Sequence, residues 1–291
     1  MWSVVVLSGR PKQGKTPLSV NLAFELNRQL EVQRAKILYV DLTPTLLGTF
    51  ALSYYDPDDQ RHMGNVLSGY YGHVTEIVRP SRQIGKDTRG QHGGKTLFRK
   101  EDLLVAPGSP LLYQVELDYF ERGGYRTMHI LRDALAAARY DWCILDPPVG
   151  LSVLTNVAIA AASGYLIVVD AKDPQWQEGL SSLSYAINLI ATRYNPRLKG
   201  LGVVLTNYDK RIPIVRDRPD EISQYFADEH LPIFQSGLTS TYEDELANRK
   251  LIWESGNWPF AASSAPMMRL GEVVRELMER VDGLRIQEAV A

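Results

Sequence analysis

The sequence predicts an α/β protein built on a doubly wound, mostly parallel sheet with helices on both faces. Short apolar runs alternate with longer segments in which apolar residues recur every three or four positions, and this alternation is typical of βαβ units. Continuous apolar runs indicate strands buried on both faces, as in parallel sheets. We expect roughly five to seven strands, among them residues 4–8, 37–41, 103–106, 142–146, 165–169 and 201–206.

The first apolar run leads directly into a phosphate-binding loop. Residues 9–16 read G-x-x-x-x-G-K-T, and a helix is expected to begin where the loop ends, so that backbone N–H groups and the helix N-terminus face the same anion. This motif predicts a P-loop NTPase. The candidate nucleotide-binding residues are Gly9, Arg10, Pro11, Lys12, Gln13, Gly14, Lys15, Thr16 and Pro17.

Each fixed position of this loop has a physical role. Gly9 and Gly14 permit backbone turns that a Cβ atom would obstruct. Lys15 can reach the β- and γ-phosphates, and the Thr16 hydroxyl can ligate Mg²⁺. Pro17 is tolerated because its fixed φ suits a first helical turn. The motif therefore predicts ATP with Mg²⁺ as the ligand.

Helical periodicity fills the segments between the expected strands. Apolar residues at four-residue spacing mark the first crossover helix: Leu18, Leu22, Leu26 and Leu30. Further helices are expected at residues 127–139 and 179–194, with a short helical piece at 63–67. A polar loop is expected at 53–62.

The C-terminal segment predicts an amphipathic helix. Its polar face carries both arginines and glutamates. We therefore expect it to pack on the sheet rather than to anchor in a membrane, which favours a basic polar face. The apolar face consists of Met267, Leu270, Val273, Val274, Leu277, Met278 and Val281.

Length and composition are those of a globular protein. The 291 residues can form one large domain or two small ones, and we expect a single domain over residues 1–291. The formal net charge of −2 means that contact with nucleic acid would need a local basic patch. The single cysteine, Cys143, fits a reducing, cytoplasmic setting. Neither a membrane span nor a signal peptide is expected.

A basic, glycine-rich segment interrupts the pattern at about residues 79–100. It contains seven basic residues and one acid, Asp87. Such a composition cannot bury a core, so a charged surface loop is expected. The loop either contacts nucleic-acid phosphates or is simply solvated. The basic residues are Arg79, Arg82, Lys86, Arg89, Lys95, Arg99 and Lys100.

Two aspartates end expected strands. Asp41 follows the second run and Asp146 follows the run at 142–145. The carboxyl ends of strands form the ligand-binding edge of open α/β sheets. Asp146 is the candidate Mg²⁺ acid, because P-loop NTPases hold the metal through a strand-terminal Asp. Asp41 is either a second acid at the site or a turn residue.

The order of these motifs resembles the ParA/MinD/Soj family of partition and positioning ATPases. The P-loop, D-L-x-P at 41–44, D-P-P at 146–148 and L-T-N-Y-D at 205–209 follow one another from residue 2 to about residue 282. The resemblance implies that Lys15 and Thr16 bind phosphate and Mg²⁺, with Asp146 and Asp41 near the metal. Asn207 would lie at the adenine.

Two positions depart from the family pattern. The family's signature lysine, which contacts the phosphates of the partner subunit, is replaced by Arg10, and Lys12 is a second candidate for that contact. Arg10 keeps the charge but has a planar fork. The family's Asp that orients the attacking water is replaced by Thr43, which cannot act as a carboxylate. We expect Lys15, Asp41 and Arg10 to be the catalytic residues of a slow ATPase.

The resemblance implies a nucleotide switch. ATP would drive homodimerisation and binding to nonspecific DNA, which would place the protein at the nucleoid, and an activating partner, either ParB-like or a cargo adaptor, would stimulate hydrolysis. Two alternatives stay open: a RecA- or helicase-like motor, because R-P-x-x-G-K-T occurs at residues 10–16, and a nucleotide-binding adaptor that does not hydrolyse ATP.

Overall fold

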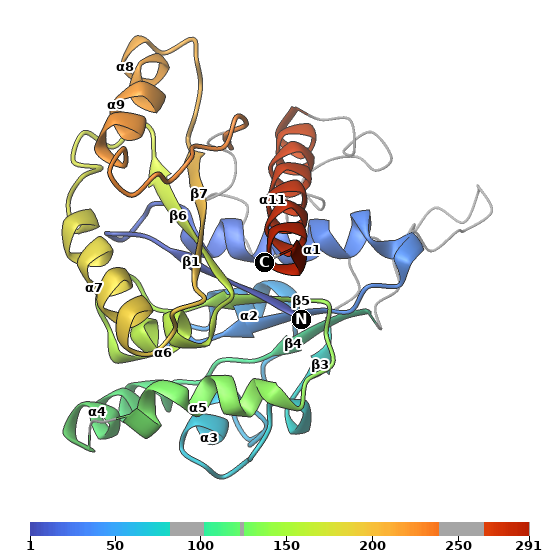
Figure 1. Cartoon of the computed structure of the whole chain (residues 1–291). Coiled ribbons are helices and arrows are strands. Elements are labelled where there is room, and N and C mark those ends of the chain that lie inside the picture. Colours follow the sequence, from blue (N-terminus) through green and yellow to red (C-terminus); the bar gives the residue numbers. More distant parts are fainter. Residues whose placement is uncertain (82–101, 123–124, 239–264, 291) are drawn as a thin grey trace.

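The computed structural model describes residues 1–81, 102–122, 125–238 and 265–290 (Figure 1). They form a seven-stranded sheet in the order β3-β4-β2-β5-β1-β6-β7. The sheet is parallel except at its edge, where β3 pairs antiparallel with β4. The predicted doubly wound fold is confirmed. The strands are β1 Trp2–Leu7, β2 Ile37–Asp41, β3 Arg79–Pro80, β4 Leu103–Ala106, β5 Trp142–Asp146, β6 Gly164–Asp170 and β7 Lys199–Thr206.

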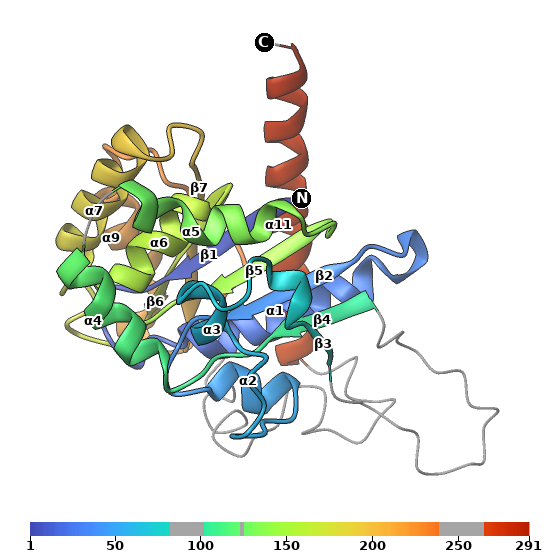
Figure 2. The ribbon, with the colours of Figure 1, turned by 90° about the horizontal axis from the view of Figure 1, so that it is seen from below.

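Helices cover both faces of the sheet (Figures 1 and 2). The described helices are α1 Lys15–Gln29, α2 Leu47–Leu52, α3 Met63–Leu67, α4 Leu112–Arg122, α5 Tyr125–Ala136, α6 Val153–Ala161, α7 Leu180–Arg193, α8 Pro213–Arg216, α9 Arg218–Tyr225 and α11 Ala265–Val290. Each face of the sheet carries its own hydrophobic cluster. Helices α1, α2 and α11 pack on one face, and α3 to α7 with α9 pack on the other. Alternate residues of each strand feed the two clusters because successive side chains of a strand point to opposite faces.

The predicted strands and helices are all present, with ends shifted by a few residues. The helix expected at 127–139 is α5, and the one expected at 179–194 is α7. Five of the described helices were not predicted: α2, α4, α6, α8 and α9. The expected basic loop begins instead as strand β3 at Arg79, and residues 82–100 lie outside the described part of the chain.

The C-terminal helix packs against the sheet, as expected. Leu270, Val273, Val274, Leu277 and Val281 of α11 are buried, and the helix contacts α1 and β7. Figure 2 shows the C-terminal end of α11 extending away from the body of the molecule. Among the described helices, none is long and apolar enough to cross a membrane.

Candidate nucleotide-binding site

The P-loop lies between β1 and α1 at the carboxyl edge of the sheet. Strand β1 is central, with β5 on one side and β6 on the other. The loops that follow β2, β5, β6 and β7 therefore lie at the same edge as the P-loop. This is where open α/β sheets bind ligands.

Gly14 shows why the loop needs glycine before the lysine. Its φ of 79° lies in the left-handed region, and it caps the N-terminus of α1. An added Cβ atom would lie 3.0 Å from the Thr206 methyl group, and the Thr206 hydroxyl donates to the backbone oxygen of Gln13 at 2.9 Å. The loop is thus fixed against the end of β7. Lys12 also has a positive φ, 64°, and its side chain is exposed.

Lys15 and Asp146 form a buried ion pair. The Lys15 ammonium donates to Asp146 Oδ1 and to the backbone oxygen of Pro147, each at 2.5 Å. Ser19 also donates to Oδ1, at 3.1 Å, while the Tyr39 hydroxyl donates to Oδ2 at 2.8 Å. Both carboxylate oxygens are therefore satisfied, which a fully buried charge requires.

Asp41 is held by the loop that follows it. One oxygen accepts from the backbone N–H and hydroxyl of Thr43, and the other accepts from the same two groups of Thr49. Burial raises the pKa of the Asp41 carboxyl, and the charge of Asp146 raises it further, whereas these hydrogen bonds oppose the rise. Asp41 thus orders the turn between β2 and α2 beside Asp146.

Arg10 is bound within its own chain. Its guanidinium lies 3.3 Å from Asp173 and 3.3 Å from Glu178, and it donates to the backbone and side-chain oxygens of Gln175 at 3.2 Å each. The acceptors belong to the segment between β6 and α7. Arg10 is therefore bound by a neighbouring loop of its own chain, whereas the Lys12 side chain remains exposed.

Asn207 lies beside the P-loop. It has a φ of 51°, and its amide donates to Asp170 Oδ2 at 2.8 Å. The backbone N–H of Asp170 donates in turn to the side chain of Gln13 at 2.7 Å, and Gln13 donates to Asp173 at 2.7 Å. Gln13 is buried and ties the P-loop to the end of β6.

The structure brings several residues to the site that were not predicted: Ser19, Tyr39, Thr49, Asp170 and Asp173. Tyr39 carried a readable signal, because it is a hydroxyl-bearing residue in an otherwise aliphatic run ending in aspartate. The roles of Asp170 and Asp173 depend on contacts between distant segments.

The residues present fit a nucleotide with its metal. Within the described residues, no group of three His, Cys, Asp or Glu side chains could hold a metal ion. Magnesium does not need such a group, because it is usually held by one or two carboxylates together with substrate phosphates and water. Thr16 is partly exposed in the first turn of α1, next to Lys15, which bonds to Asp146. Asp41 lies opposite Asp146 on the neighbouring strand, so the chain offers a hydroxyl and two carboxylates of the kind that this donor set needs.

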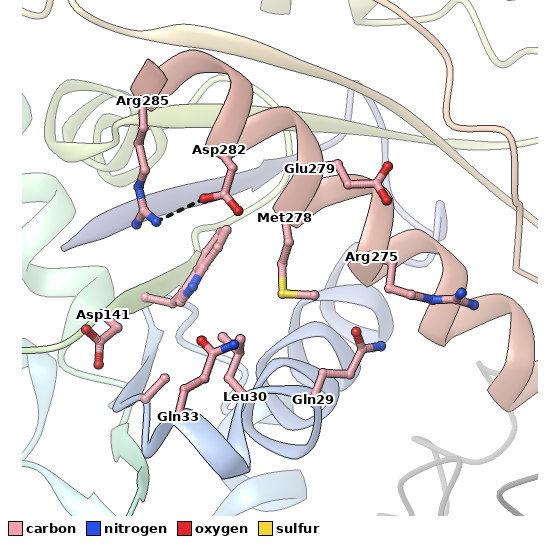
Figure 3. Close-up of a pocket in the computed structure, with 11 residues that line it drawn as sticks. Gln29, Leu30, Gln33, Asp141, Arg275, Met278, Glu279, Asp282 and Arg285 are labelled. Atoms are coloured by element: carbon pink, nitrogen blue, oxygen red, sulfur yellow. Dashed lines mark hydrogen bonds and ion pairs between the residues drawn. The ribbon is translucent and has the colours of Figure 1, made fainter. Parts of the chain in front are cut away.

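A separate pocket of about 460 Å³ lies between the end of α1, the start of β5 and α11 (Figure 3). Trp142, the first residue of β5, lines it, so it is at the opposite edge of the sheet from Asp146. Its charged lining is mixed: Asp141, Arg275, Glu279, Asp282 and Arg285.

Comparisons with known proteins agree with this geometry. The profile of the AAA domain family matches residues 10–200. The chromosome partitioning protein ParA of Myxococcus xanthus is 37% identical over 222 residues, covering 73% of this chain and 67% of that protein.

Two solved structures share the fold. The McdA–ATP complex of Cyanothece superposes with a TM-score of 0.73 at 17% identity, covering 97% of this chain and 96% of that chain. The cobyrinic acid a,c-diamide synthase of Mycobacterium smegmatis with bound ADP and magnesium has a TM-score of 0.66 at 21% identity, covering 88% and 97%.

The strand, loop and helix around Lys15, set in this sheet, define a P-loop NTPase. Within that class the chain belongs to the ParA/MinD/Soj family. The resemblance seen in the order of the motifs is therefore confirmed.

Proposed function

We propose that this protein is an ATP-binding switch that dimerises with ATP and Mg²⁺ and segregates or positions DNA or another cargo. The observation that carries the proposal is the meeting of the P-loop lysine with Asp146 at the carboxyl edge of the sheet. The relatives support it, because the matched M. xanthus protein is a chromosome partitioning protein.

ATP would occupy the P-loop through backbone N–H groups and Lys15, with its base toward Asn207. Thr16, Asp146 and Asp41 would hold the metal ion. When bound, Mg²⁺ neutralises charge on the phosphate oxygens. With ATP bound, Lys15 would exchange its bond to Asp146 for bonds to phosphate, so that one charge-assisted interaction would replace another.

Turnover without a partner is expected to be slow. The Thr43 hydroxyl donates to Asp41 at 2.6 Å, and a threonine hydroxyl cannot accept a proton from water near neutral pH. Loss of a positioned base typically costs about 10² to 10⁴ in rate. We infer that a partner protein, either ParB-like or a cargo adaptor, stimulates hydrolysis.

Two basic sets are candidates for contact with nonspecific DNA. The first, residues 79–100, lies largely outside the described residues. The second set is Lys210, Arg211, Arg216 and Arg218. Of these, Arg218 is buried and bonded to Glu221, while Arg211 and Arg216 pair with aspartates. Lys210 is therefore the member of the second set whose charge is least compensated. One lysine is a small patch for binding phosphates, so we favour the first set as the surface that contacts DNA.

A second candidate function is that of a nucleotide-dependent adaptor which does not hydrolyse ATP. Thr43 favours it, because a threonine stands where the family has a carboxylate, and its hydroxyl donates to Asp41. Membership of the partition family disfavours a helicase-like motor.

The test is calorimetric titration with Mg-ATP combined with light scattering. The parent should bind ATP and become a dimer, and Lys15→Ala should lose at least about tenfold in affinity because loop amides alone compensate phosphate charge less well. Lys36→Ala is the matched control, since the exposed Lys36 precedes β2 at the opposite edge of the sheet. Equal binding by Lys15→Ala and the parent would refute the P-loop assignment.

A further inference from the structure

Tyr39 is a polar group inside an aliphatic strand. It lies in the middle of β2 and is fully buried. In the parallel pairing of β2 with β5, Tyr39 lies opposite Ile144 and Asp41 lies opposite Asp146. Asp146 is two residues beyond Ile144 and so points to the same face of the sheet as Tyr39. This diagonal spacing is within reach of a long aromatic side chain.

The Tyr39 hydroxyl meets the carboxylate of Asp146. It donates to Oδ2 at 2.8 Å, whereas Lys15 and Ser19 both donate to Oδ1. The two oxygens thus have different partners. Oδ2 has a neutral donor fixed by the core of the sheet, while Oδ1 is paired with the lysine expected to turn toward phosphate.

Gly48 makes room for this hydroxyl. A Cβ atom at Gly48 would lie 1.8 Å from the Tyr39 oxygen and 2.6 Å from the ring carbon that carries it. Gly48 is within helix α2, where glycine is otherwise unfavourable. Packing therefore explains the glycine at position 48: a larger residue there would collide with the Tyr39 hydroxyl, so the two positions depend on each other.

We propose that Tyr39 is a positioning residue for Asp146: its hydroxyl fixes Oδ2, so that the carboxylate keeps Oδ1 turned toward the P-loop, where the nucleotide and Mg²⁺ would bind. The inference rests on the proposed function. If Lys15 turned to the phosphates of a bound nucleotide, Asp146 would lose its charged partner, and a buried carboxylate left with fewer donors is costly. The Tyr39 hydroxyl keeps the carboxylate oriented through that exchange.

The test is nucleotide binding measured with and without magnesium, using Tyr39→Phe. This change keeps the ring and removes the donor. The Mg²⁺ concentration that half-restores ATP binding should rise at least about tenfold, the scale typical for partners that orient metal ligands. Binding of ATP in EDTA should change less than about twofold. Tyr140→Phe is the matched control, because Tyr140 is also buried but lies just before β5, at the far edge.

A second pair of variants separates positioning from packing. Gly48→Ala alone should lower the melting temperature, because its methyl group collides with the phenol. The double variant Tyr39→Leu with Gly48→Ala should recover melting temperature while keeping the weakened response to Mg²⁺. Recovery of both properties would show that the phenol only fills space and would overturn the proposal.

Two further results would contradict the proposed role of Tyr39. If Tyr39→Phe responds to Mg²⁺ like the parent, or loses binding equally in EDTA, Tyr39 does not position Asp146 for the metal. If the parent binds no nucleotide under either condition, the proposed function itself fails, and this inference fails with it.

Discussion

Arg10 of the P-loop lies 3.3 Å from Asp173 of the same chain. Glu178 is at the same distance from the guanidinium, and Gln13 bonds to Asp173 from within the loop. The residue expected to reach across a dimer is therefore held by its own subunit. Dimer formation through Arg10 would compete with these contacts.

Neutralising the acids that hold Arg10 should promote dimerisation. The pairs are partly exposed, with side-chain exposures of 27% and 17% for Arg10–Asp173 and 59% for Glu178, so together they contribute about 1 kcal/mol. Asp173→Asn with Glu178→Gln should lower the ATP concentration for half-dimerisation about fivefold in light scattering. Glu31→Gln, in the 3₁₀ turn Glu31–Gln33, is the control. An unchanged midpoint would mean that Arg10 does not limit dimerisation.

Removing Lys15 should destabilise the fold as well as weaken ATP binding. The pair is buried, with exposures of 4% for Lys15 and 0% for Asp146. Breaking such a pair costs about 3–5 kcal/mol because the remaining charge is unpaired. We expect a loss of that order in urea unfolding of Lys15→Ala, and partial recovery in Lys15→Ala with Asp146→Asn. If the single variant is as stable as the parent, the ion pair does not persist in solution.

Introducing a carboxylate at position 43 should raise ATP turnover. Thr43→Asp supplies a group that can accept a proton from water, and the gain should be at least about tenfold, within the range for a positioned base. Phosphate release measures the rate. Thr43→Asn has similar shape without a base and serves as control, so equal turnover in both variants would point to another group, with Asp41 the first to test.

Cys143 should be inert in the folded protein. It is fully buried in β5, and burial raises the pKa of its thiol well above the usual range. A thiol reagent should therefore modify it at the rate of unfolding, and fast labelling in native buffer would show that β5 is accessible.

The raised pKa of the Cys143 thiol also predicts that the folded protein loses stability at high pH. In the unfolded chain the thiol ionises above about pH 8.5, whereas the folded chain keeps its proton, so stability falls as pH rises beyond that point. The slope is at most about 1.4 kcal/mol per pH unit. Cys143→Ala should show a shallower fall between pH 8.5 and 10 in urea unfolding.

DNA binding should depend mainly on the basic residues of the segment at 79–100. Neutralising Arg82, Lys86, Arg89 and Lys95 should weaken binding to duplex DNA and flatten its salt dependence, because fewer counterions are released. Neutralising Lys210, Arg211 and Arg216 should have a smaller effect, since Arg211 and Arg216 already pair with aspartates. Unchanged affinity and salt slope after both sets of changes would favour a protein scaffold as the cargo.

The sequence by itself determined the elements whose signals are local. The run before Gly9 and the run ending at Asp146 are continuous apolar stretches, and such stretches predict buried strands without knowledge of the partners. The P-loop is equally local, because its glycines and Lys15 act within one turn of chain. Helix α1 followed from the four-residue spacing of its leucines.

The tertiary structure decided which of these groups meet. Nothing in the separate segments shows that Tyr39 contacts Asp146, because that contact depends on the register of β2 on β5 and on the space left by Gly48. Nor could spacing place Arg10 against Asp173, which lies 163 residues away. Hydrogen bonds and ion pairs act over a few ångströms, so pairs distant in sequence are set by the packing of the sheet rather than by any pattern in the chain.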